Sequence, residues 1–341
     1  MTRVLQAMAG AVHGGAEAFF ERLAVALDRA GEDQAIVIRR NPERAARLRR
    51  EGLAPLQLPF GGVFDLVTKP RLARAIAEFR PRVVLTWMSR ATALCPRGDF
   101  VHVARLGGYY DLRHYRHCDH LIGNTRGLAT WLIAQGWPEG RVHYLPNFAE
   151  DARAAPLPRA AFATPEDAPL ALALGRLHRN KGFDVLLEAI ARIEGLYLWL
   201  AGDGPLEADL KRRAASLGIA GRVRFLDWRA DVPALLAACD VLVSSARIEP
   251  LGNTIIEAWA AAKPVIAASA SGPAELIADE RTGLLVPLED AAALAAALRR
   301  LLVDRTLAAS LAAAGRAAFE AQFSEASVVA AYRDFFAKVA R

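Results

Sequence analysis

The chain has 341 residues, of which 53% are hydrophobic and 23% charged, a composition that excludes a disordered or fibrous protein. Its length suits two domains of ordinary size. The net charge is +6, and no apolar run approaches the roughly 18 residues that a membrane-spanning helix needs. The first residues also lack the apolar core of a signal peptide, so we expect a cytoplasmic protein.

Short apolar runs alternate with longer amphipathic segments along the chain. The predicted strands of the first half are Val4–Met8, Ala35–Arg39, Val83–Trp87, Phe100–Ala104, Leu121–Gly123 and Val142–Leu145. Those of the second half are Leu170–Leu174, Tyr197–Ala201, Val223–Leu226, Val241–Ser244, Val265–Ala268 and Leu284–Val286. Predicted helices separate most of them, for example Ala16–Ala30, Gly182–Ile193, Leu206–Leu217 and Asn253–Ala262. This alternation predicts an α/β fold with parallel, doubly wound sheets covered by helices on both faces.

A break separates the two halves. Residues 150–169 contain four prolines and no periodic pattern, which is typical of a connecting segment. We expect an N-terminal domain at 1–150, a linker at 151–168 and a second Rossmann-like domain at 169–322. The helical tail at 323–341 is long enough to cross back to the first domain. Two such domains facing each other across a cleft would bind ligands at the carboxyl ends of their strands.

Positive charge is concentrated in the first half. Residues 1–150 hold 21 Lys and Arg against 14 Asp and Glu, a net +7, whereas residues 151–341 have a net −1. The most basic stretches contain Arg39, Arg40, Arg44, Arg47, Arg49 and Arg50, and then Lys69, Arg71 and Arg74. They form either an ordinary solvated surface or one that attracts an anionic membrane or an acidic acceptor. Nucleic acid is not expected as a partner, because no aromatic residues are interleaved with these charges.

The cysteines and histidines do not form a recognisable metal or redox motif. The three cysteines are odd in number and lack a CxxC pair, so we interpret them as reduced thiols: Cys95, Cys118 and Cys239. One dense group would suit zinc by composition: His114, His117, Cys118 and His120. No second pair of ligands accompanies this group, and we expect no metal.

Two strand-end turns in the second half carry glycines. In Gly175–Gly182, which follows a predicted strand, Arg176 and Lys181 supply two cations. Such a loop suits a diphosphate, because Arg offers a planar fork of donors and Lys a point charge. The turn Gly202–Pro205 follows the next strand, and we interpret it as structural.

A third element, Glu249–Glu257, runs from a loop into a helix. Gly252, Asn253 and Thr254 open this helix, whose free N–H groups attract phosphate. Glu257 lies about one turn inside the helix, where it could accept hydrogen bonds from ribose hydroxyls. Glu249, on the loop, could meet sugar hydroxyls. A fourth element, Ser271–Glu275 and then Thr282–Pro287, predicts a turn, a helix and a buried strand.

Together these elements resemble the donor domain of the family-four retaining glycosyltransferases, which have the GT-B architecture. The family shows a GRL…KG loop, a GDGP turn, a Glu-x7-Glu element entering a helix that reads EA-x-A-x-x-x-PV, and a late TGLLV strand. All of them occur here in order within Leu170–Pro287. The resemblance implies that Arg176 and Lys181 hold the donor diphosphate. It also implies that Glu249 meets the donor sugar and Glu257 the ribose.

The first half resembles the family less closely. Gly14 and Gly15, in the run Gly14–Glu17, match its Gly-rich opening loop, which approaches the donor phosphates and the acceptor. Asn124-Thr125 and Pro146-Asn147 match the end of the first domain.

Two positions depart from the family pattern. Many members place a His at the end of the fourth strand, facing the reacting sugar. Here either His102 or Arg105 could take that role, and Arg105 is favoured because it lies nearer the strand end. The Gly that usually follows the third donor-domain strand is Asp227, followed by Trp228. This loop commonly borders the nucleobase, so the base is left open, with uridine expected first.

The implied reaction is retaining transfer of a hexose-type sugar from a nucleotide-diphosphate donor to a glycan or lipid-linked acceptor of the cell envelope, such as lipopolysaccharide. Negative charge grows on the leaving phosphate. The two cations, the Gly14–Gly15 backbone and the helix after Gly252 would stabilise that charge without a metal or another cofactor. The acceptor is expected to attack on the leaving-group face.

Other functions remain open. A sugar-nucleotide epimerase or hydrolase could use the same scaffold, and so could a non-catalytic nucleotide-sugar-binding module. The joint presence of the two cations and two carboxylates disfavours the module. A nicotinamide dehydrogenase is discounted, because Ala9–Gly15 does not match the GxGxxG pattern.

Overall fold

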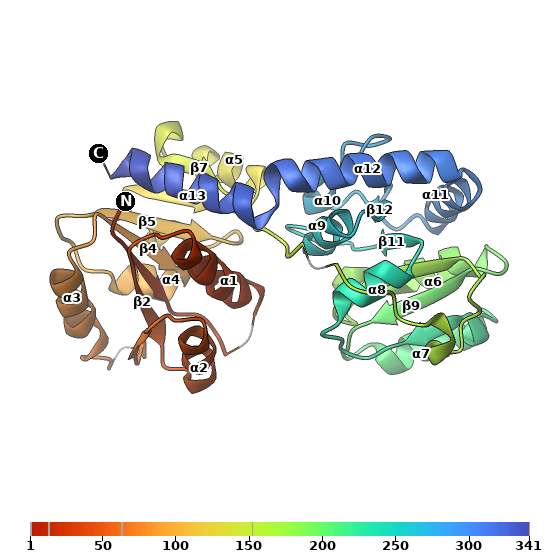
Figure 1. Ribbon diagram of the computed structural model, residues 1–341, viewed down its shortest axis with the longest axis horizontal. Coiled ribbons are helices and arrows are strands. Elements are labelled where there is room, and N and C mark those ends of the chain that lie inside the picture. Colours follow the sequence, from red (N-terminus) through yellow and green to blue (C-terminus); the bar gives the residue numbers. More distant parts are fainter. Residues whose placement is uncertain (1, 13, 63, 152, 341) are drawn as a thin grey trace. The chain divides into compact units, whose positions relative to one another are not determined.

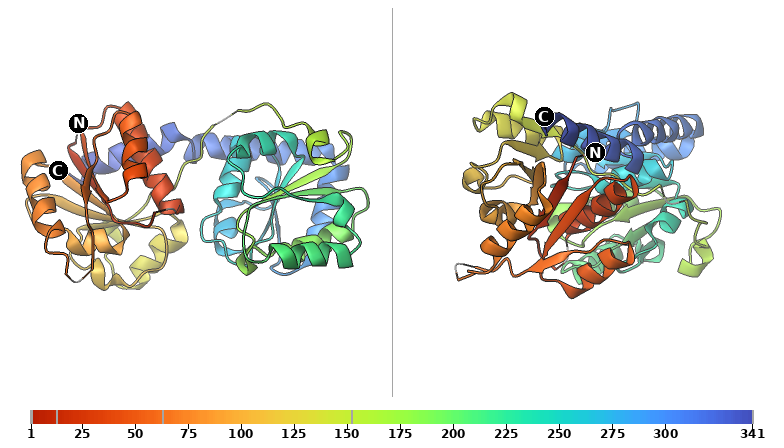
Figure 2. Two further views of the ribbon diagram at one scale, coloured as in Figure 1. Left: turned by 90° about the horizontal axis from the view of Figure 1, so that it is seen from below. Right: turned by 60° about the vertical axis from the view of Figure 1, so that its left-hand side comes forward.

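The protein is described here from a computed structural model, which covers residues 2–12, 14–62, 64–151 and 153–340. The chain forms two compact units. Unit 1 comprises Met1–Phe148 and Glu325–Arg341, and unit 2 comprises Ala149–Ser324. In each unit a parallel sheet lies between two layers of helices (Figures 1 and 2).

The described part of unit 1 contains a seven-stranded parallel sheet in the order β3-β2-β1-β4-β5-β6-β7. Its strands are β1 (Val4–Met8), β2 (Gln34–Arg39), β3 (Leu56–Leu58), β4 (Val83–Trp87), β5 (Val101–Leu106), β6 (His120–Gly123) and β7 (Val142–Tyr144). One face is covered by α1 (Gly15–Arg29), α2 (Pro42–Arg50) and α13 (Glu325–Val339). The other face is covered by α3 (Thr68–Phe79), α4 (Met88–Leu94) and α5 (Arg126–Ala134). Two short 3-10 turns complete the unit: η1 (Leu112–His114) and η2 (Glu139–Arg141).

The described part of unit 2 contains a six-stranded parallel sheet in the order β10-β9-β8-β11-β12-β13. Its strands are β8 (Leu170–Leu174), β9 (Tyr197–Ala201), β10 (Val223–Phe225), β11 (Val241–Ser244), β12 (Val265–Ala268) and β13 (Leu284–Val286). One face packs against α6 (Phe183–Ala191), α7 (Glu207–Ser216) and α11 (Ala291–Val303). The other packs against α8 (Val232–Ala238) and α9 (Asn253–Ala260). The remaining elements are α10 (Ser271–Leu276), α12 (Arg305–Gln322), η3 (Arg159–Phe162), η4 (Arg179–Lys181) and η5 (Ala220–Arg222).

The strand prediction is confirmed for every strand except β3, which it missed. All five residues of β1 are buried, as are all five of β4, which explains why both strands read as continuous apolar runs. In contrast, β3 has three residues and stands between Pro55 and Pro59, so no periodic pattern marks it.

The segment expected to be a linker packs on unit 2. The Arg159 guanidinium donates to the carbonyl of Ala238 at 2.8 Å and pairs with Asp240 at 3.2 Å. The Trp199 indole donates to Thr164 Oγ1 at 3.0 Å. The helix after this unit, α13, is grouped with unit 1, where it lies beside α1. No helix within the described ranges is long and apolar enough to cross a bilayer.

Both sheets share one topological feature. The chain runs outward from a central strand (β1 or β8), then returns to that strand's other side to build the rest of the sheet. The switch points therefore lie between β1 and β4 and between β8 and β11. In open parallel sheets, ligands bind at the carboxyl ends of the strands on either side of such a point.

Candidate active site

At the switch point of unit 2, the loops that follow β8 and β11 are joined along their backbones. The N–H groups of Arg247 and Ile248 donate to the carbonyl of Asn180 at 2.8 and 3.1 Å. The Ser245 hydroxyl donates to the carbonyl of Lys181 at 2.9 Å. These bonds fix the two loops as one surface at the carboxyl edge of the sheet.

The loop after β9 packs tightly against that surface. Gly202 has a φ of 148°, and a Cβ at this position would lie only 1.9 Å from the carbonyl oxygen of Gly175. No side chain fits there, so glycine is required by both backbone angle and space. The Gly202 N–H donates to the carbonyl of Asp227 at 2.7 Å, which adds the loop after β10 to the same surface.

Lys181 and Glu249, predicted from separate motifs, form an ion pair across the switch point. Their side chains are 25% and 14% exposed, so the pair is partly shielded from solvent. The second carboxylate oxygen of Glu249 accepts the N–H of Gly252 at 3.1 Å, which holds the loop just before α9. Arg176, on the β8 loop, is exposed and has no side-chain hydrogen bond or ion pair among the described residues.

Helix α9 begins at this surface. Gly252 precedes it in a left-handed conformation, with φ of 87°, and Asn253 and Thr254 form its half-buried first turn. Glu257 lies four residues after Asn253, hence on the same side of the helix, and is also half-buried. The helix start, with its N–H groups and dipole, favours a negatively charged ligand.

The loop after β10 explains one departure from the family pattern. Asp227 has a φ of 53°, the left-handed conformation for which glycine is the usual residue. Asp tolerates this conformation better than most side chains, so the turn is preserved without glycine. Trp228 follows and is 70% exposed, which leaves a broad aromatic face at the carboxyl edge of the sheet.

In unit 1, the glycine-rich loop after β1 closes around a buried carboxylate. Glu17, in the first turn of α1, is 4% exposed and accepts the N–H of Ala11 at 2.6 Å. A Cβ at Gly10 or Gly14 would come within 2.2 Å of a Glu17 oxygen. The glycines therefore make room for this carboxylate, and Gly15 is the exposed first residue of α1. The approach of Gly14 and Gly15 to a donor phosphate remains a prediction.

Arg105 lies near the carboxyl end of β5, but its side chain is turned into the protein. It is 3% exposed, and its guanidinium lies 4.7 Å from the ring centres of both Phe19 and Trp87. It donates to Tyr332 Oη of α13 at 2.8 Å and to Asn147 Oδ1. These contacts differ from the expected position facing the reacting sugar, and they make Arg105 a brace between β5 and α13.

Comparison with known proteins identifies the family. Two family models match the chain: "Glycosyl transferase 4-like domain" over residues 14–147 and "Glycosyl transferases group 1" over residues 168–304. The lipopolysaccharide core biosynthesis glycosyltransferase LpsE of Rhizobium meliloti is 37% identical over 334 residues, which cover 95% of this chain and 96% of LpsE. The chain belongs to the family-four glycosyltransferases.

Further relatives agree with this assignment. LpsD of Rhizobium meliloti, also named a lipopolysaccharide core biosynthesis glycosyltransferase, is 36% identical over 331 residues, covering 95% of each chain. Among solved structures, a glycosyltransferase from Rickettsia africae has a TM-score of 0.88 at 19% identity, covering 99% of this chain and 98% of that one. HepE of Anabaena, solved in complex with UDP, has a TM-score of 0.84 at 20% identity, covering 99% and 100%. These structural likenesses support the GT-B fold of the glycosyltransferase.

One residue of the candidate site has no counterpart in the sequence prediction. Arg247 donates two hydrogen bonds of 2.8 Å to Asp184 in the first turn of α6, and one of 2.9 Å to Glu289. Hydrogen bonds to these carboxylates raise the pKa of Arg247, while the bond from Arg247 lowers the pKa of Asp184 despite its burial. Arg247 thus braces the loop that carries Glu249. In the sequence, the only sign of this role is that Arg247 stands two positions before Glu249.

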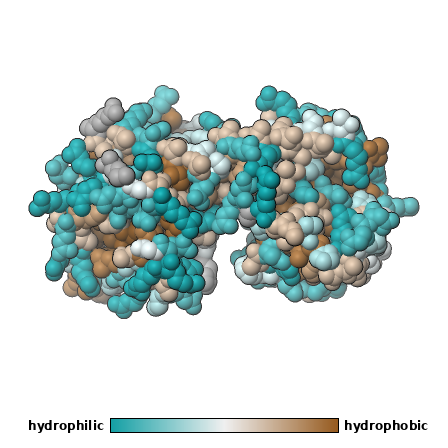
Figure 3. Space-filling view, viewed as in Figure 1, coloured by the Kyte–Doolittle hydropathy of each residue, from teal (hydrophilic) through white to brown (hydrophobic). Residues whose placement is uncertain are grey.

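Two arginines of the basic stretch of unit 1 form ion pairs within the unit. Arg44 is 1% exposed and, with Arg47, forms an ion pair with Glu21 at 2.8 Å. Burial raises the pKa of Glu21, but the hydrogen bonds from these two arginines outweigh it and lower the pKa overall. Arg49 and Arg50 remain exposed, and the visible face of unit 1 is largely hydrophilic (Figure 3).

The residues of the possible zinc group do not converge on one point in the part of the chain that the structure describes. The members of this group contact different partners at hydrogen-bond distance. His117 contacts Arg97, Cys118 contacts His102, and His120 contacts His143. Within the described ranges, no three His, Cys, Asp or Glu side chains are placed to share a metal ion. His102 itself is interior, and burial lowers its pKa to about 4.

Proposed function

We propose that this glycosyltransferase moves a hexose-type sugar from a nucleotide-diphosphate donor to a glycan or glycolipid acceptor in lipopolysaccharide synthesis, with retention at the anomeric carbon. The observation that carries the proposal is the joined surface at the switch point of unit 2. There Lys181, Glu249 and the start of α9 lie together, with the exposed Arg176 on the adjoining loop. The names of LpsE and LpsD support the choice of pathway.

In the proposed reaction, the bond between the anomeric carbon and the β-phosphate oxygen breaks, and negative charge grows on that phosphate. Arg176 and Lys181 face the charge as cations, and the N–H groups that open α9 at Asn253 and Thr254 add their dipoles. Groups that are fixed before the reaction stabilise the transition state most effectively. Here the backbone hydrogen bonds to the Asn180 carbonyl and the hydrogen bond from Arg247 to Asp184 hold these groups in place.

The remaining donor contacts follow from the same surface. Glu249 meets hydroxyls of the transferred sugar, and Glu257 on α9 accepts hydrogen bonds from the ribose. Asp227 and the exposed Trp228 border the nucleobase, where an indole face suits stacking against a planar ring. The acceptor hydroxyl attacks from the side that the leaving phosphate occupied, which retains the configuration, and its proton passes to that phosphate. Neither a metal nor another cofactor is required in this scheme.

Peripheral association with an anionic membrane is part of the proposal. The exposed charges of unit 1 and the exposed apolar side chains of Phe64 and Leu66 (94% and 84%), just before Lys69, support it. Co-sedimentation with anionic and neutral lipid vesicles tests this point, and equal recovery with both would remove it from the proposal.

A thermal-stability screen with UDP-, GDP- and ADP-sugars tests the donor class. A ligand at about 100 times its dissociation constant stabilises the fold by about 2.7 kcal/mol. UDP-sugars are screened first. The nucleotide sugar that stabilises the protein is then incubated with the protein, with and without acceptor. Conversion of the donor alone would favour an epimerase or hydrolase, and binding without any turnover a non-catalytic module. No stabilisation by any nucleotide sugar would overturn the proposal.

A further inference from the structure

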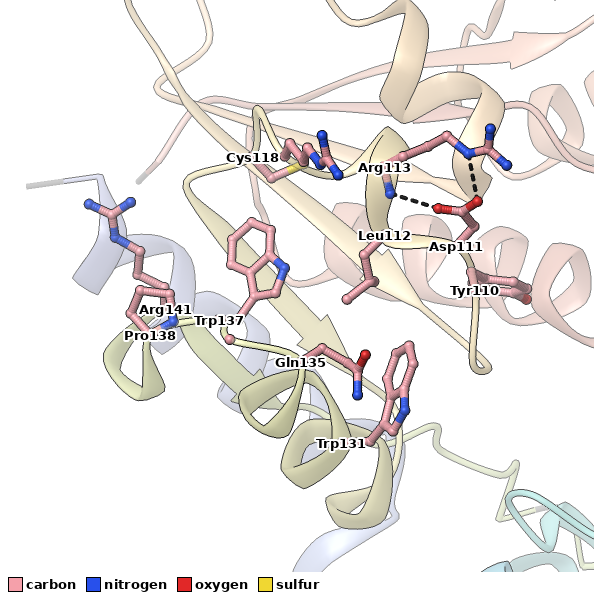
Figure 4. Close-up of a pocket in the computed structure, with 12 residues that line it drawn as sticks. Tyr110, Asp111, Leu112, Arg113, Cys118, Trp131, Gln135, Trp137, Pro138 and Arg141 are labelled. Atoms are coloured by element: carbon pink, nitrogen blue, oxygen red, sulfur yellow. Dashed lines mark hydrogen bonds and ion pairs between the residues drawn. The ribbon is translucent and has the colours of Figure 1, made fainter.

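Unit 1 contains a groove that none of the donor residues line. It encloses about 640 Å³, within the ~300–1,000 Å³ range of small-molecule sites. Its walls are the connection from β5 to β6, including η1, and the end of α5 with the loop that follows (Figure 4). The groove begins at Tyr110, four residues after the end of β5, and reaches Arg141 at the start of β7.

The lining is rich in aromatic rings and poor in aliphatic side chains. Tyr110, Trp131 and Trp137 line it, and Gln135 lies between the two indoles in Figure 4. Tyr109 packs edge-on against Trp131, with ring centres 5.2 Å apart, which fixes that indole. Flat rings next to planar amide groups suit a sugar, since the C–H face of a pyranose stacks on an aromatic ring while its hydroxyls need hydrogen-bond partners.

The groove also carries excess positive charge. Arg113 is paired with Asp111, but Arg116 and Arg141 are exposed and have no ion pair among the residues that the structure describes. Free guanidinium groups bind phosphate and carboxylate through two parallel hydrogen bonds. A neutral sugar would leave both of these cations unused.

We propose that this groove binds an acidic part of the acceptor, a saccharide carrying phosphate or carboxylate groups next to the sugar that is glycosylated. The inference rests on the proposed function, because it names the acceptor class of the same enzyme. The sugar rings stack on Trp131 and Trp137, and the acidic groups pair with Arg116 and Arg141.

The position of Tyr110 brings one end of the groove to the carboxyl edge of the sheet of unit 1. Tyr110 follows the carboxyl end of β5, which lies at the same edge of the parallel sheet as the loop after β1 that holds Glu17. A saccharide in the groove therefore extends toward the loop after β1. The groove is concave and its cations stand beside aromatic rings, which favours a saccharide over a lipid surface.

Binding by the full-length protein tests the inference without any donor. The probe is the core oligosaccharide released from Rhizobium meliloti lipopolysaccharide by deacylation. It is used intact, and again after its phosphates are removed and its carboxylates reduced. Calorimetry gives Kd for the wild type and for R116Q/R141Q. The matched control, R49Q/R50Q, removes the same charge from two exposed residues of α2.

We expect R116Q/R141Q to weaken binding of the intact probe at least about tenfold, because the variant removes both guanidinium groups that would bond to its phosphates or carboxylates. Binding of the neutralised probe should be weak and equal in all three proteins. Trp137→Leu should weaken both forms, because stacking does not depend on charge, and its melting temperature shows whether it folds. Thermal stabilisation by the donor should stay unchanged throughout, which separates this test from that of the proposed function.

Several outcomes would overturn the inference. One is absence of probe binding to the wild type, and another is an equal loss in R49Q/R50Q. A third is an unchanged Kd in R116Q/R141Q. The last is binding of anionic phospholipid vesicles that R116Q/R141Q abolishes while probe binding persists, which would assign the groove to a membrane.

Discussion

The two units share one folding plan but arrange their charged groups in opposite ways. In unit 2 the charged groups at the switch point are partly exposed, as in the Lys181–Glu249 pair. In unit 1 the corresponding groups are withdrawn: Glu17 is 4% exposed and Arg105 is 3% exposed. Unit 2 therefore leaves the charges at its switch point partly open to solvent, whereas unit 1 uses Glu17 and Arg105 to hold its own loops and its terminal helix.

The same contrast appears in backbone geometry. Unit 2 forms the turns after β9 and β10 with Gly202 and with Asp227, which tolerates a positive φ. In unit 1, Met88 directly follows β4 and has a φ of 71°. This left-handed conformation is one that a long side chain such as methionine rarely adopts. Non-glycine residues in this conformation are uncommon and concentrate at functional sites. Unit 1 therefore also has a candidate functional edge, although no charged motif marks it.

The largest expected effect is in unit 2. Lys181→Ala should lower kcat by ~10²–10³, because losing one preorganised group that stabilises developing charge costs about that much. The fold should persist, since Lys181 lies in a loop. Lys211→Ala is the control, because Lys211 is exposed on α7, where it forms an ion pair with Glu207 of the same helix. Undiminished turnover of Lys181→Ala with the correct donor would remove Lys181 from the leaving-group site.

Substitutions of Glu249 and Glu257 should affect different kinetic parameters. Glu249→Gln should lower kcat about 10–100-fold with little change in KM, because a charged hydrogen bond of about 1.5–3 kcal/mol is strengthened as the sugar ring becomes cationic. Glu257→Gln should mainly raise the donor KM, since ribose is bound equally before and during the reaction. Kinetics with varied donor at saturating acceptor separate the two. A kcat defect confined to Glu257→Gln would reverse these roles.

The sequence predicted unit 2 better than unit 1 for a physical reason. In unit 2 the site is made by loops that directly follow strands, so the order of motifs along the chain is also their order in space. Lys181 and Glu249 could be found in this way. Arg247 could not, because its role depends on which carboxylates, Asp184 and Glu289, the fold brings to it.

In unit 1 the decisive contacts join residues far apart in sequence. Arg105 is held by Tyr332, more than two hundred residues away, and no local pattern predicts that bond. The groove residues from Tyr110 to Arg141 come from two connections that only the folded sheet brings together. The sequence indicated a basic domain, but it did not reveal that Arg44 is buried against Glu21 while Arg116 is exposed.

Replacing Arg105 tests whether the buried charges of unit 1 stabilise its own structure. Arg105→Gln should lower the melting temperature by several degrees, because buried charged hydrogen bonds contribute about 1.5–3 kcal/mol each. The kcat of the folded fraction should change only a few-fold. Tyr332→Phe, which removes one partner and leaves Arg105 in place, should give a smaller drop. A large kcat loss in Arg105→Gln with an unaltered melting temperature would instead place Arg105 at the reacting sugar.

Mild acid should destabilise unit 1 more than unit 2. Burial lowers the pKa of both His102 and His143 to about 4, from an ordinary value of 6.5. The unfolded chain therefore takes up protons before the folded unit does. The stabilising contribution is complete above about pH 6.5 and is lost as the pH falls toward 4. Calorimetry across this window should show a falling melting temperature, with a shallower fall in His102→Gln and no change of slope in His178→Gln, whose side chain is exposed in unit 2.

The smallest expected effect is that of chelation. If unit 2 supplies the positive charge at the leaving phosphate through Arg176, Lys181 and the start of α9, excess EDTA should leave the initial rate unchanged. The comparison is sharper in Lys181→Ala, where one of those charges is missing. Because a divalent ion is a compact cation that bridges phosphate oxygens, added Mn²⁺ should partly restore this variant while leaving the wild type unaffected. A wild-type rate that EDTA abolishes and Mn²⁺ restores would contradict the proposal, since it would show that the protein's own cations do not suffice. The charges presented by unit 2 would then serve to bind the donor, and the leaving group would depend on a metal.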